Sequence, residues 1–277
     1  MSPPRAEPLS LLSTTRSSPA GTWSPLPYGD APRLRAAELE DHWPQLHAGA
    51  GPPPPPAPGP LAEAWALYHS GDFERAVEQA LASGPAGLAL ANQATAIYAN
   101  YLEPRESVRL ALFKQVAERT QAQLAREPDD CHALYWQAYA LARYGQAISV
   151  ARALAQGLGT RVKGALERVI ALQPLHADAH VALGAFHAEV IDKVGPLVAR
   201  MTYGSRADTA IALFERGLEL CPRSPSALME YGRALLMLYG DSKMAEATRL
   251  YERAAAIEPA DARERLEVEL ARAGLKD

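Results

Sequence analysis

A short pattern that returns along the chain constrains its fold more than any other feature. An alanine is followed by an aromatic residue four positions later and by a proline eight positions after that, once at Ala210, Phe214 and Pro222 and again at Ala247, Tyr251 and Pro259. A period of this kind indicates stacked helical units, each of which buries its apolar face against its neighbours. Because proline has no N–H to donate, the two prolines mark the ends of helices.

The segments upstream of this pattern carry the other half of a known repeat. In register with W-x2-L-G-x2-Y, they read His180, Leu183, Gly184 and His187, then Leu228, Tyr231, Gly232 and Leu235. With these two halves together, the chain resembles the tetratricopeptide repeat (TPR) family. The resemblance implies antiparallel helix pairs in which a small residue, Gly184 or Gly232, lies where the two helices of a pair cross.

We therefore predict an all-α fold, a TPR-like α-α superhelix, in which a solenoid of antiparallel helix pairs ends in a terminal helix. About five pairs are expected, over residues 61–83, 88–126, 129–172, 176–220 and 225–257. The terminal helix should begin at Asp261. It is expected to close the array with a polar outer face, formed by Glu264, Arg265, Glu267, Glu269 and Arg272.

The prolines that end the repeats are spaced more widely than the usual period of about 34 residues. Subtracting the expected helices places extra residues at 145–160, at 192–206 and, in smaller number, at 240–243. Insertions in repeat proteins gather on one side, often the binding side. Over residues 128–260 this layout also resembles the regulator of microtubule dynamics-like and solute-uptake-associated TPR proteins, and no function is taken from that likeness.

The first 60 residues differ in composition from the rest of the chain. They hold 15 of the 23 prolines, including the run at 52–56, which favours an extended polyproline II spacer or ligand. Few apolar residues are available to offset the entropy of ordering this stretch. The sequence predicts a disordered proline-rich N-terminal arm and linker over 1–60, with a short helix near 32–43, and a helical repeat domain over 61–277.

Charge and hydropathy exclude several classes of partner. The formal net charge is −4, and because both signs are interspersed we expect no nucleic-acid partner and no membrane partner. No window approaches the ~20 apolar residues of a spanning helix. The sequence thus predicts a cytoplasmic protein, unless a leader lies upstream of the assigned start. The two cysteines, Cys131 and Cys221, are too few for a disulfide scaffold.

Motifs of catalysis and of cofactor binding are absent, so we expect no enzyme and no cofactor. His176, His180 and His187 share one helix face, which would suit a metal if Asp178, Glu189 or Asp192 joined them. However, Ala177 stands where a zincin has its glutamate, and His180 and His187 occupy packing positions of the repeat. Packed imidazoles are the competing interpretation.

The inward faces of the first helices supply the candidate binding site, and its expected residues are His132, Tyr135, Tyr139, Arg143, Asp178, Val181, Met229 and Arg233. They are too poor in cations for the carboxylate clamp of some TPR proteins. They predict a non-catalytic interaction scaffold or adaptor that binds a partner peptide or helix in an aromatic groove. Two alternatives remain: the aromatic segment 135–144 could pack on the insertion, or the insertions could close a pocket, as in a small-molecule carrier or an enzyme accessory subunit.

Overall fold

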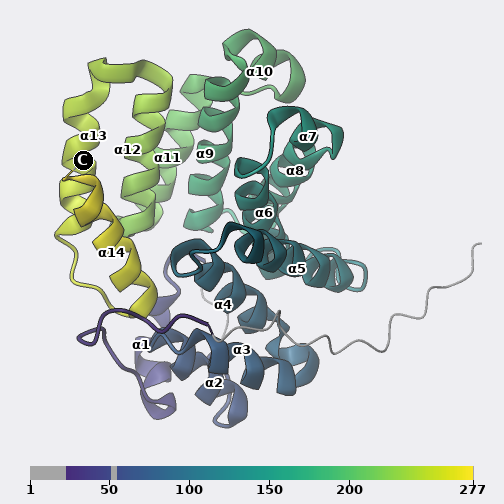
Figure 1. Ribbon diagram of the computed structural model, residues 1–277, viewed down its shortest axis with the longest axis vertical. Helices are drawn as coiled ribbons and strands as arrows, with labels where there is room; N and C mark the ends of the chain where they lie inside the picture. The colour runs from purple at the N-terminus through teal and green to yellow at the C-terminus, as the bar shows by residue number, and fades with distance from the viewer. Residues whose placement is uncertain (1–22, 51–54, 277) are drawn as a thin grey trace, which may run out of the picture.

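The computed structural model describes residues 23–50 and 55–276, and the regular secondary structure in these ranges is entirely helical (Figure 1). Five helix pairs follow one another: α2 (Pro60–His69) with α3 (Phe73–Ala82), α4 (Leu88–Tyr101) with α5 (Glu106–Leu124), α6 (Cys131–Gln146) with α8 (Leu158–Leu172), α9 (Ala177–Val194) with α11 (Ala207–Leu220), and α12 (Pro225–Tyr239) with α13 (Met244–Ala255). The helix α1 (Leu39–Leu46) precedes them and α14 (Ala262–Gly274) follows. The predicted fold is confirmed.

The repeat signature works by close approach of the two helices in a pair. A Cβ on Gly184 would lie 3.0 Å from the ring of Phe214 and 3.1 Å from the carbonyl oxygen of Ala210. Gly232 has the same relation to Tyr251, at 3.0 Å. Because interiors are close-packed, a larger residue at either glycine would separate the helices. The small residue of one helix and the A-x3-aromatic pattern of the next are therefore complementary surfaces.

The insertions fold as short helices at the ends of two neighbouring pairs. The first contains α7 (Val150–Ala155), the second α10 (Pro196–Tyr203), and the smallest forms the 3-10 turn η3 (Gly240–Lys243). The tyrosine that ends α10 reaches the start of α8, because a Cβ on Gly159 would lie 2.7 Å from Tyr203. The two long insertions thus meet at one edge of the array.

Residues 23–50 do not form the disordered arm that the composition predicts. They carry the 3-10 turn η1 (Ala36–Glu38) and α1, close to the short helix expected near 32–43. Trp23 stacks on Tyr98 with ring centroids 3.9 Å apart, and Trp43 is 2% exposed against Trp65. Aromatic side chains bury enough area to order a segment that has few other apolar residues. Packing therefore begins before residue 61, whereas residues 1–22 and 51–54, which include the first three prolines of the run at 52–56, lie outside the described residues.

The terminal helix is not a solvent-facing cap, and this expectation is corrected. Of its five charged residues expected on the surface, Arg272 is exposed, Glu264, Arg265 and Glu269 are half-buried, and Glu267 is 2% exposed. The reason is that α14 contacts both the last repeat and α2 of the first, so it has two faces to bury. Figure 1 shows the yellow C-terminal helix beside the purple N-terminal elements.

The two ends of the chain are joined by polar contacts at this meeting point. Nδ1 of His69, at the end of α2, lies 2.7 Å from Oδ2 of Asp261, and both side chains are buried. Nearby, Arg265 lies over the ring of Tyr28 and 3.1 Å from Asp30. The superhelix is thereby closed into a ring, and its concave face becomes the wall of a central cavity.

Within the described residues, no helix is long and apolar enough to cross a membrane.

Candidate functional site

A central cavity of about 370 Å³ lies inside the ring. Its wall is built by the first helices of successive pairs, α4, α6, α9 and α12, with α14 on the remaining side. Seven of the eight predicted groove residues line it: Tyr135, Tyr139, Arg143, Asp178, Val181, Met229 and Arg233. The helical spacing in the sequence predicts this common face, because residues three or four apart on a helix lie on the same side.

Two aromatic residues of α6, Tyr135 and Tyr139, line this cavity. Tyr135 lies against His176 with ring centroids 5.1 Å apart, and Tyr139 has the guanidinium of Arg143 5.3 Å from its ring centroid. The hydroxyl oxygen of Tyr139 is buried and has no hydrogen-bond partner among the described residues. The cavity wall therefore offers aromatic faces.

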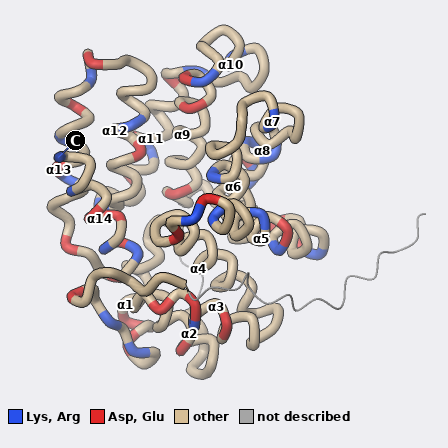
Figure 2. Tube along the Cα trace, viewed as in Figure 1, with Lys and Arg blue, Asp and Glu red and all other residues tan. Residues whose placement is uncertain are grey.

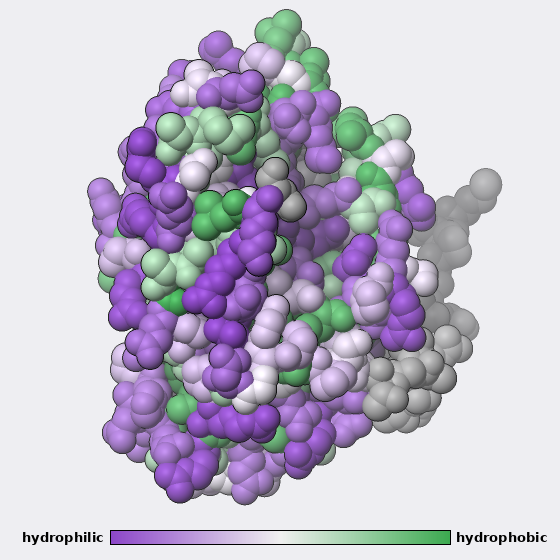
Figure 3. Space-filling model, turned by 60° about the vertical axis from the view of Figure 1, so that its left-hand side comes forward, coloured by the Kyte–Doolittle hydropathy of each residue, from purple (hydrophilic) through white to green (hydrophobic). Residues whose placement is uncertain are grey.

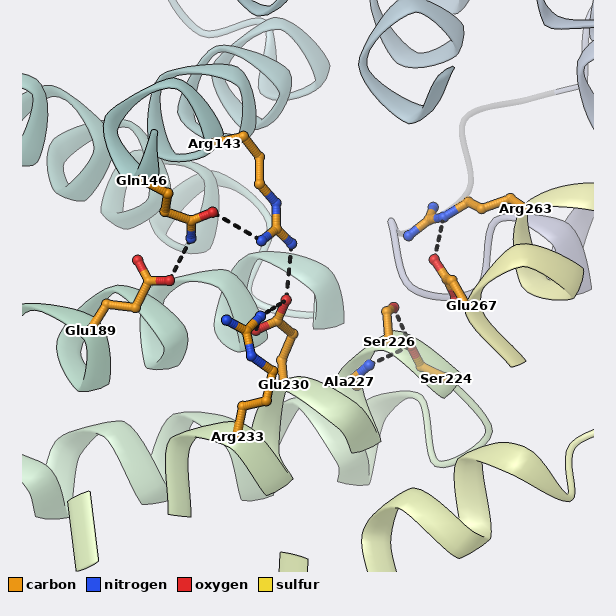
Figure 4. A network of polar contacts seen from close by, with 10 residues as sticks. All are labelled: Arg143, Gln146, Glu189, Ser224, Ser226, Ala227, Glu230, Arg233, Arg263 and Glu267. Carbon is orange, nitrogen blue, oxygen red and sulfur yellow. Dashed lines mark hydrogen bonds and ion pairs between the residues drawn. The ribbon is translucent and has the colours of Figure 1, made fainter. Parts of the chain in front are cut away.

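One side of the cavity holds a chain of polar groups that crosses three helices (Figure 4). Arg143 of α6 donates to Glu230 of α12 at 2.9 Å, and Arg233 lies 3.3 Å from the same carboxylate. Arg143 also donates to the side-chain oxygen of Gln146 at 3.2 Å, and Gln146 donates in turn to Glu189 of α9. The network fixes the spacing of α6, α9 and α12 at the cavity.

The two carboxylates of this network have opposite pKa shifts. Burial opposes ionisation of Glu230, but the charges of Arg143 and Arg233 outweigh it and hold the pKa of Glu230 below its usual value. Burial and the neighbouring charge of Glu230 raise the pKa of Glu189, whose hydrogen-bond partner is a neutral amide. Glu189 is thus the carboxylate of this group that is most readily protonated.

A second cluster of charged side chains lies between two cavities inside the ring. Arg263 of α14 donates to Glu267 at 2.9 Å and lies 3.8 Å from Asp178 of α9. Burial disfavours the charge of Arg263, yet these two carboxylates outweigh burial and hold its pKa well above the ordinary value. The three side chains line both the central cavity and a smaller one of about 190 Å³.

The smaller cavity contains the remaining predicted residue, His132. Its Nε2 accepts a hydrogen bond from Trp136 at 3.1 Å, and burial lowers its pKa to about 4. The N-terminal segment that follows α1 covers this cavity, where the amide of Asp178 donates to the carbonyl of Gly49 at 2.9 Å. His132 is therefore separated from the groove in which the sequence placed it.

The three histidines of the metal hypothesis each have a packing role. His176 caps α9 by accepting from the amide of Ala179 at 3.1 Å, and His180 Nε2 lies 3.0 Å from the carbonyl of Pro174. His187 is buried with its ring edge-on to Phe186, and burial lowers its pKa. Across the described part of the chain, no group of three His, Cys, Asp or Glu side chains is arranged to hold a metal ion.

The end of the cavity nearest the insertions is apolar. It is lined by Leu154 of α7, Leu158 of α8, Phe186 and Val190 of α9, and Tyr203 of α10. The sequence placed the insertions on the binding side, and they do border the cavity. A ligand here would meet these apolar side chains beside Gln146 and Glu189 of the polar network.

Several lining residues were not among the eight predicted for the groove. Glu189 continues the inward row of Val181 and Ala185 by one turn, so the same periodicity could have found it. Arg263 and Glu267 could not be found in this way, since their place in the cavity depends on the closure of the ring.

No family model and no curated protein matches the chain in sequence. Among solved structures, it is similar to TTC0263, a thermophilic TPR protein in Thermus thermophilus. The two superimpose with a TM-score of 0.53 at 19% identity, over 77% of this chain and 97% of that one. A likeness at this level of identity concerns the fold, and with the helix pairs above it defines the chain as a protein of TPR-like fold.

Proposed function

We propose that this chain is a non-catalytic interaction protein that binds a short extended segment of a protein partner in its central cavity. The observation that carries the proposal is the convergence of aromatic, apolar and paired charged residues from five helices on one concave wall. Pockets that bind ligands combine a largely apolar lining with a few placed polar groups. Tyr135, Tyr139 and Met229 would bury apolar side chains of the partner, and Arg143 and Arg233 would orient its backbone.

An extended segment suits this cavity better than a helix. In an open solenoid a partner helix could lie along the concave face, but here α14 occupies that side with Arg263, Glu267 and Leu270. A helix with its side chains is about 10–12 Å wide. An extended chain is narrower and offers free N–H and C=O groups to the polar network.

Binding to peptides selected from a displayed linear library tests this proposal. We expect Ala185→Trp, which fills the cavity from α9, to abolish binding, and Tyr135→Ala with Tyr139→Ala to weaken it at least tenfold, about 1.4 kcal/mol. Ala245→Trp, at an exposed position of α13, is the matched control and should bind normally. Peptides that bind the Ala185→Trp variant as well as the parent chain would refute the cavity as the site.

The contact between the insertions favours a second candidate function, a small-molecule carrier or enzyme accessory subunit. Tyr203 of α10 lies on Gly159 of α8 and narrows the apolar end of the cavity. A volume of about 370 Å³ falls within the range of small-ligand pockets, about 300–1,000 Å³. Native mass spectrometry of the purified chain would reveal a discrete added mass that Ala185→Trp removes. An unliganded mass in both would count against this candidate.

A further inference from the structure

The two long insertions concentrate positive charge in a chain that is acidic overall. The insertions at 145–160 and 192–206 contain four Lys and Arg and one acid, Asp192. With the next residues of α8 and without Asp192, residues 145–166 and 193–207, here called the insertion tip, contain six Lys and Arg and no Asp or Glu. The whole chain has 28 cations against 32 acids, so 22 cations against 32 acids are left outside the tip. Figure 2 shows the two signs interspersed over the other helices. The expectation of no membrane partner rested on the charge of the whole chain, which conceals this asymmetry.

Four of the six cations of the tip have no ion-pair partner among the described residues: Arg152, Arg161, Lys193 and Arg200. The other two are paired with the acids that border the tip, Lys163 with Glu167 at 2.6 Å and Arg206 with Asp208 at 2.9 Å. The remaining bordering acids are Asp192, which is exposed on α9, and Glu189, which hydrogen-bonds to Gln146 in the cavity wall. The tip therefore keeps an excess of free positive charge.

Apolar side chains project into solvent among these cations. Leu197, Val198 and Met201 of α10 are 70%, 50% and 79% exposed, and Leu154 of α7 is 46% exposed. Figure 3 shows hydrophobic groups at the top of the molecule, where α10 lies. Because these three side chains of α10 are at least half exposed, they contribute little to the core. Contiguous exposed apolar groups of this kind mark interaction surfaces.

We propose that the insertion tip docks the protein on an anionic lipid surface. Leu197 and Met201 would enter the boundary between headgroups and acyl chains, while Arg152, Arg161, Lys193 and Arg200 would meet the phosphates. Such binding needs two signals, apolar insertion and basic attraction, and the tip carries both. No spanning helix is required.

The shape of the tip favours a lipid surface over a protein partner. The apolar groups of α10 project from the end of the array rather than line a groove, and partner helices dock in grooves. A bilayer accepts a projecting short helix, because its interface deforms around the inserted side chains. The proposal is independent of the cavity's ligand, although the apolar end of the cavity opens beside the tip, where Lys193 and Tyr203 line its wall.

Sedimentation of the full chain with sucrose-loaded vesicles tests the proposal. We expect binding to vesicles of phosphatidylcholine with about a third phosphatidylglycerol, and much weaker binding to phosphatidylcholine alone. Binding to the anionic vesicles should weaken when salt is raised from about 0.05 to about 0.3 M, because the shorter Debye length screens the cations.

Two double variants separate the two signals. Arg152→Gln with Arg200→Gln should lower the partition coefficient about 25-fold, or roughly fivefold per charge. Leu197→Ser with Met201→Ser should lower it at least about tenfold, since both side chains lose their insertion. The high exposure of both positions leaves the fold intact, which a thermal melt verifies. Arg249→Gln with Arg253→Gln on the outer face of α13, and Leu175→Ser at a 66% exposed position, are matched controls that should bind normally.

Two outcomes would overturn the proposal. The first is a parent chain that sediments no better with anionic vesicles than with neutral ones. The second is a set of tip variants that bind anionic vesicles as well as the controls do. If the parent chain does not sediment with vesicles but binds a synthetic acidic amphipathic helix through Leu197 and Met201, the tip is a protein-docking surface and the lipid proposal is wrong.

Discussion

The closure of the ring predicts a large effect for His69→Ala, a substitution far from the cavity. The imidazole lies 2.7 Å from Asp261, with the two side chains 1% and 5% exposed. Removing the hydrogen-bond partner of a buried polar group costs about 1–3 kcal/mol, because the group that remains stays buried without that partner. Asp261 keeps one contact, since its Oδ1 still accepts from the amide of Glu264 at 2.8 Å, which places the effect toward the lower end.

Packing adds to this cost. The imidazole of His69 stacks on Trp65 at 5.7 Å and meets the edge of Trp43 at 6.3 Å, so alanine would leave a space between the two rings. We therefore expect His69→Ala to lower the free energy of unfolding by about 3 kcal/mol, the sum of the lost hydrogen bond and the space left between the rings, measured by urea denaturation. Hydrogen exchange should locate the effect, because the amides of α14 lose protection when the ring opens.

The control is an exposed ion pair in the same repeat, between Arg75 and Asp72. Its side chains are 67% and 40% exposed, so Arg75→Ala should change stability by no more than about 0.5 kcal/mol. Asp261→Asn keeps a capping oxygen for α14 and removes the charge, which isolates the contact with His69. A loss below about 1 kcal/mol in His69→Ala, with unchanged protection of α14, would refute the closed ring as an energetic unit.

Further substitutions test the packing, the electrostatics and the polar network. Gly184→Val should lower the free energy of unfolding by about 2–3 kcal/mol in urea denaturation, because the added methyl groups meet the facing aromatic ring. Gly164→Ala, at a helical position with open space around it, should raise the free energy of unfolding by about 0.5–1 kcal/mol in the same assay. Burial raises the pKa of Glu264 to about 7, so the folded state disfavours the ionised carboxylate and stability falls as pH rises from about 4.5 to about 7. Glu264→Gln should therefore have a higher melting temperature than the parent chain at about pH 8 and the same melting temperature at about pH 4. Equal melting temperatures at both pH values would contradict the shift. Arg143→Ala leaves the half-buried Glu230 with a weaker partner and should cost about 1–3 kcal/mol, a loss that urea denaturation would show shrinking when Glu230→Gln is added.

The local parts of the fold were predictable because their causes are local. Gly184 with Phe214, and Gly232 with Tyr251, pair within single repeats, so a spacing read from the sequence identifies the contact. Helix caps follow the same rule: Asp130 accepts from the amide of Ala133 at 3.0 Å, as a residue at the N-cap should. The inward rows of α6, α9 and α12 were found for the same reason.

The N-terminal segment was misjudged because composition is an average. The many prolines between residues 23 and 60 suggested disorder, but two tryptophans supply the burial that the segment needs. Trp23 and Trp43 each pack on an aromatic ring of a later helix, and those partners cannot be assigned from composition. A few large side chains with prepared partners can therefore outweigh a polar, proline-rich average.

The curvature of the array was the decisive unknown for the site. Each repeat adds a small rotation, and whether the ends meet depends on the sum over five pairs rather than on any one sequence pattern. Once the two ends of the array meet, α14 packs against both the last repeat and the first. This explains why a helix with the composition of a polar cap buries Glu267 and places Arg263 beside Asp178. The insertions lie at the opposite edge, where α7 and α10 stay exposed. The same closure that narrows the groove to a cavity leaves exposed apolar side chains and, within the described residues, unpaired cations at the insertion tip. Arg152, Leu197, Arg200 and Met201 do not line the cavity, so these positions of the tip can be altered without changing the cavity wall.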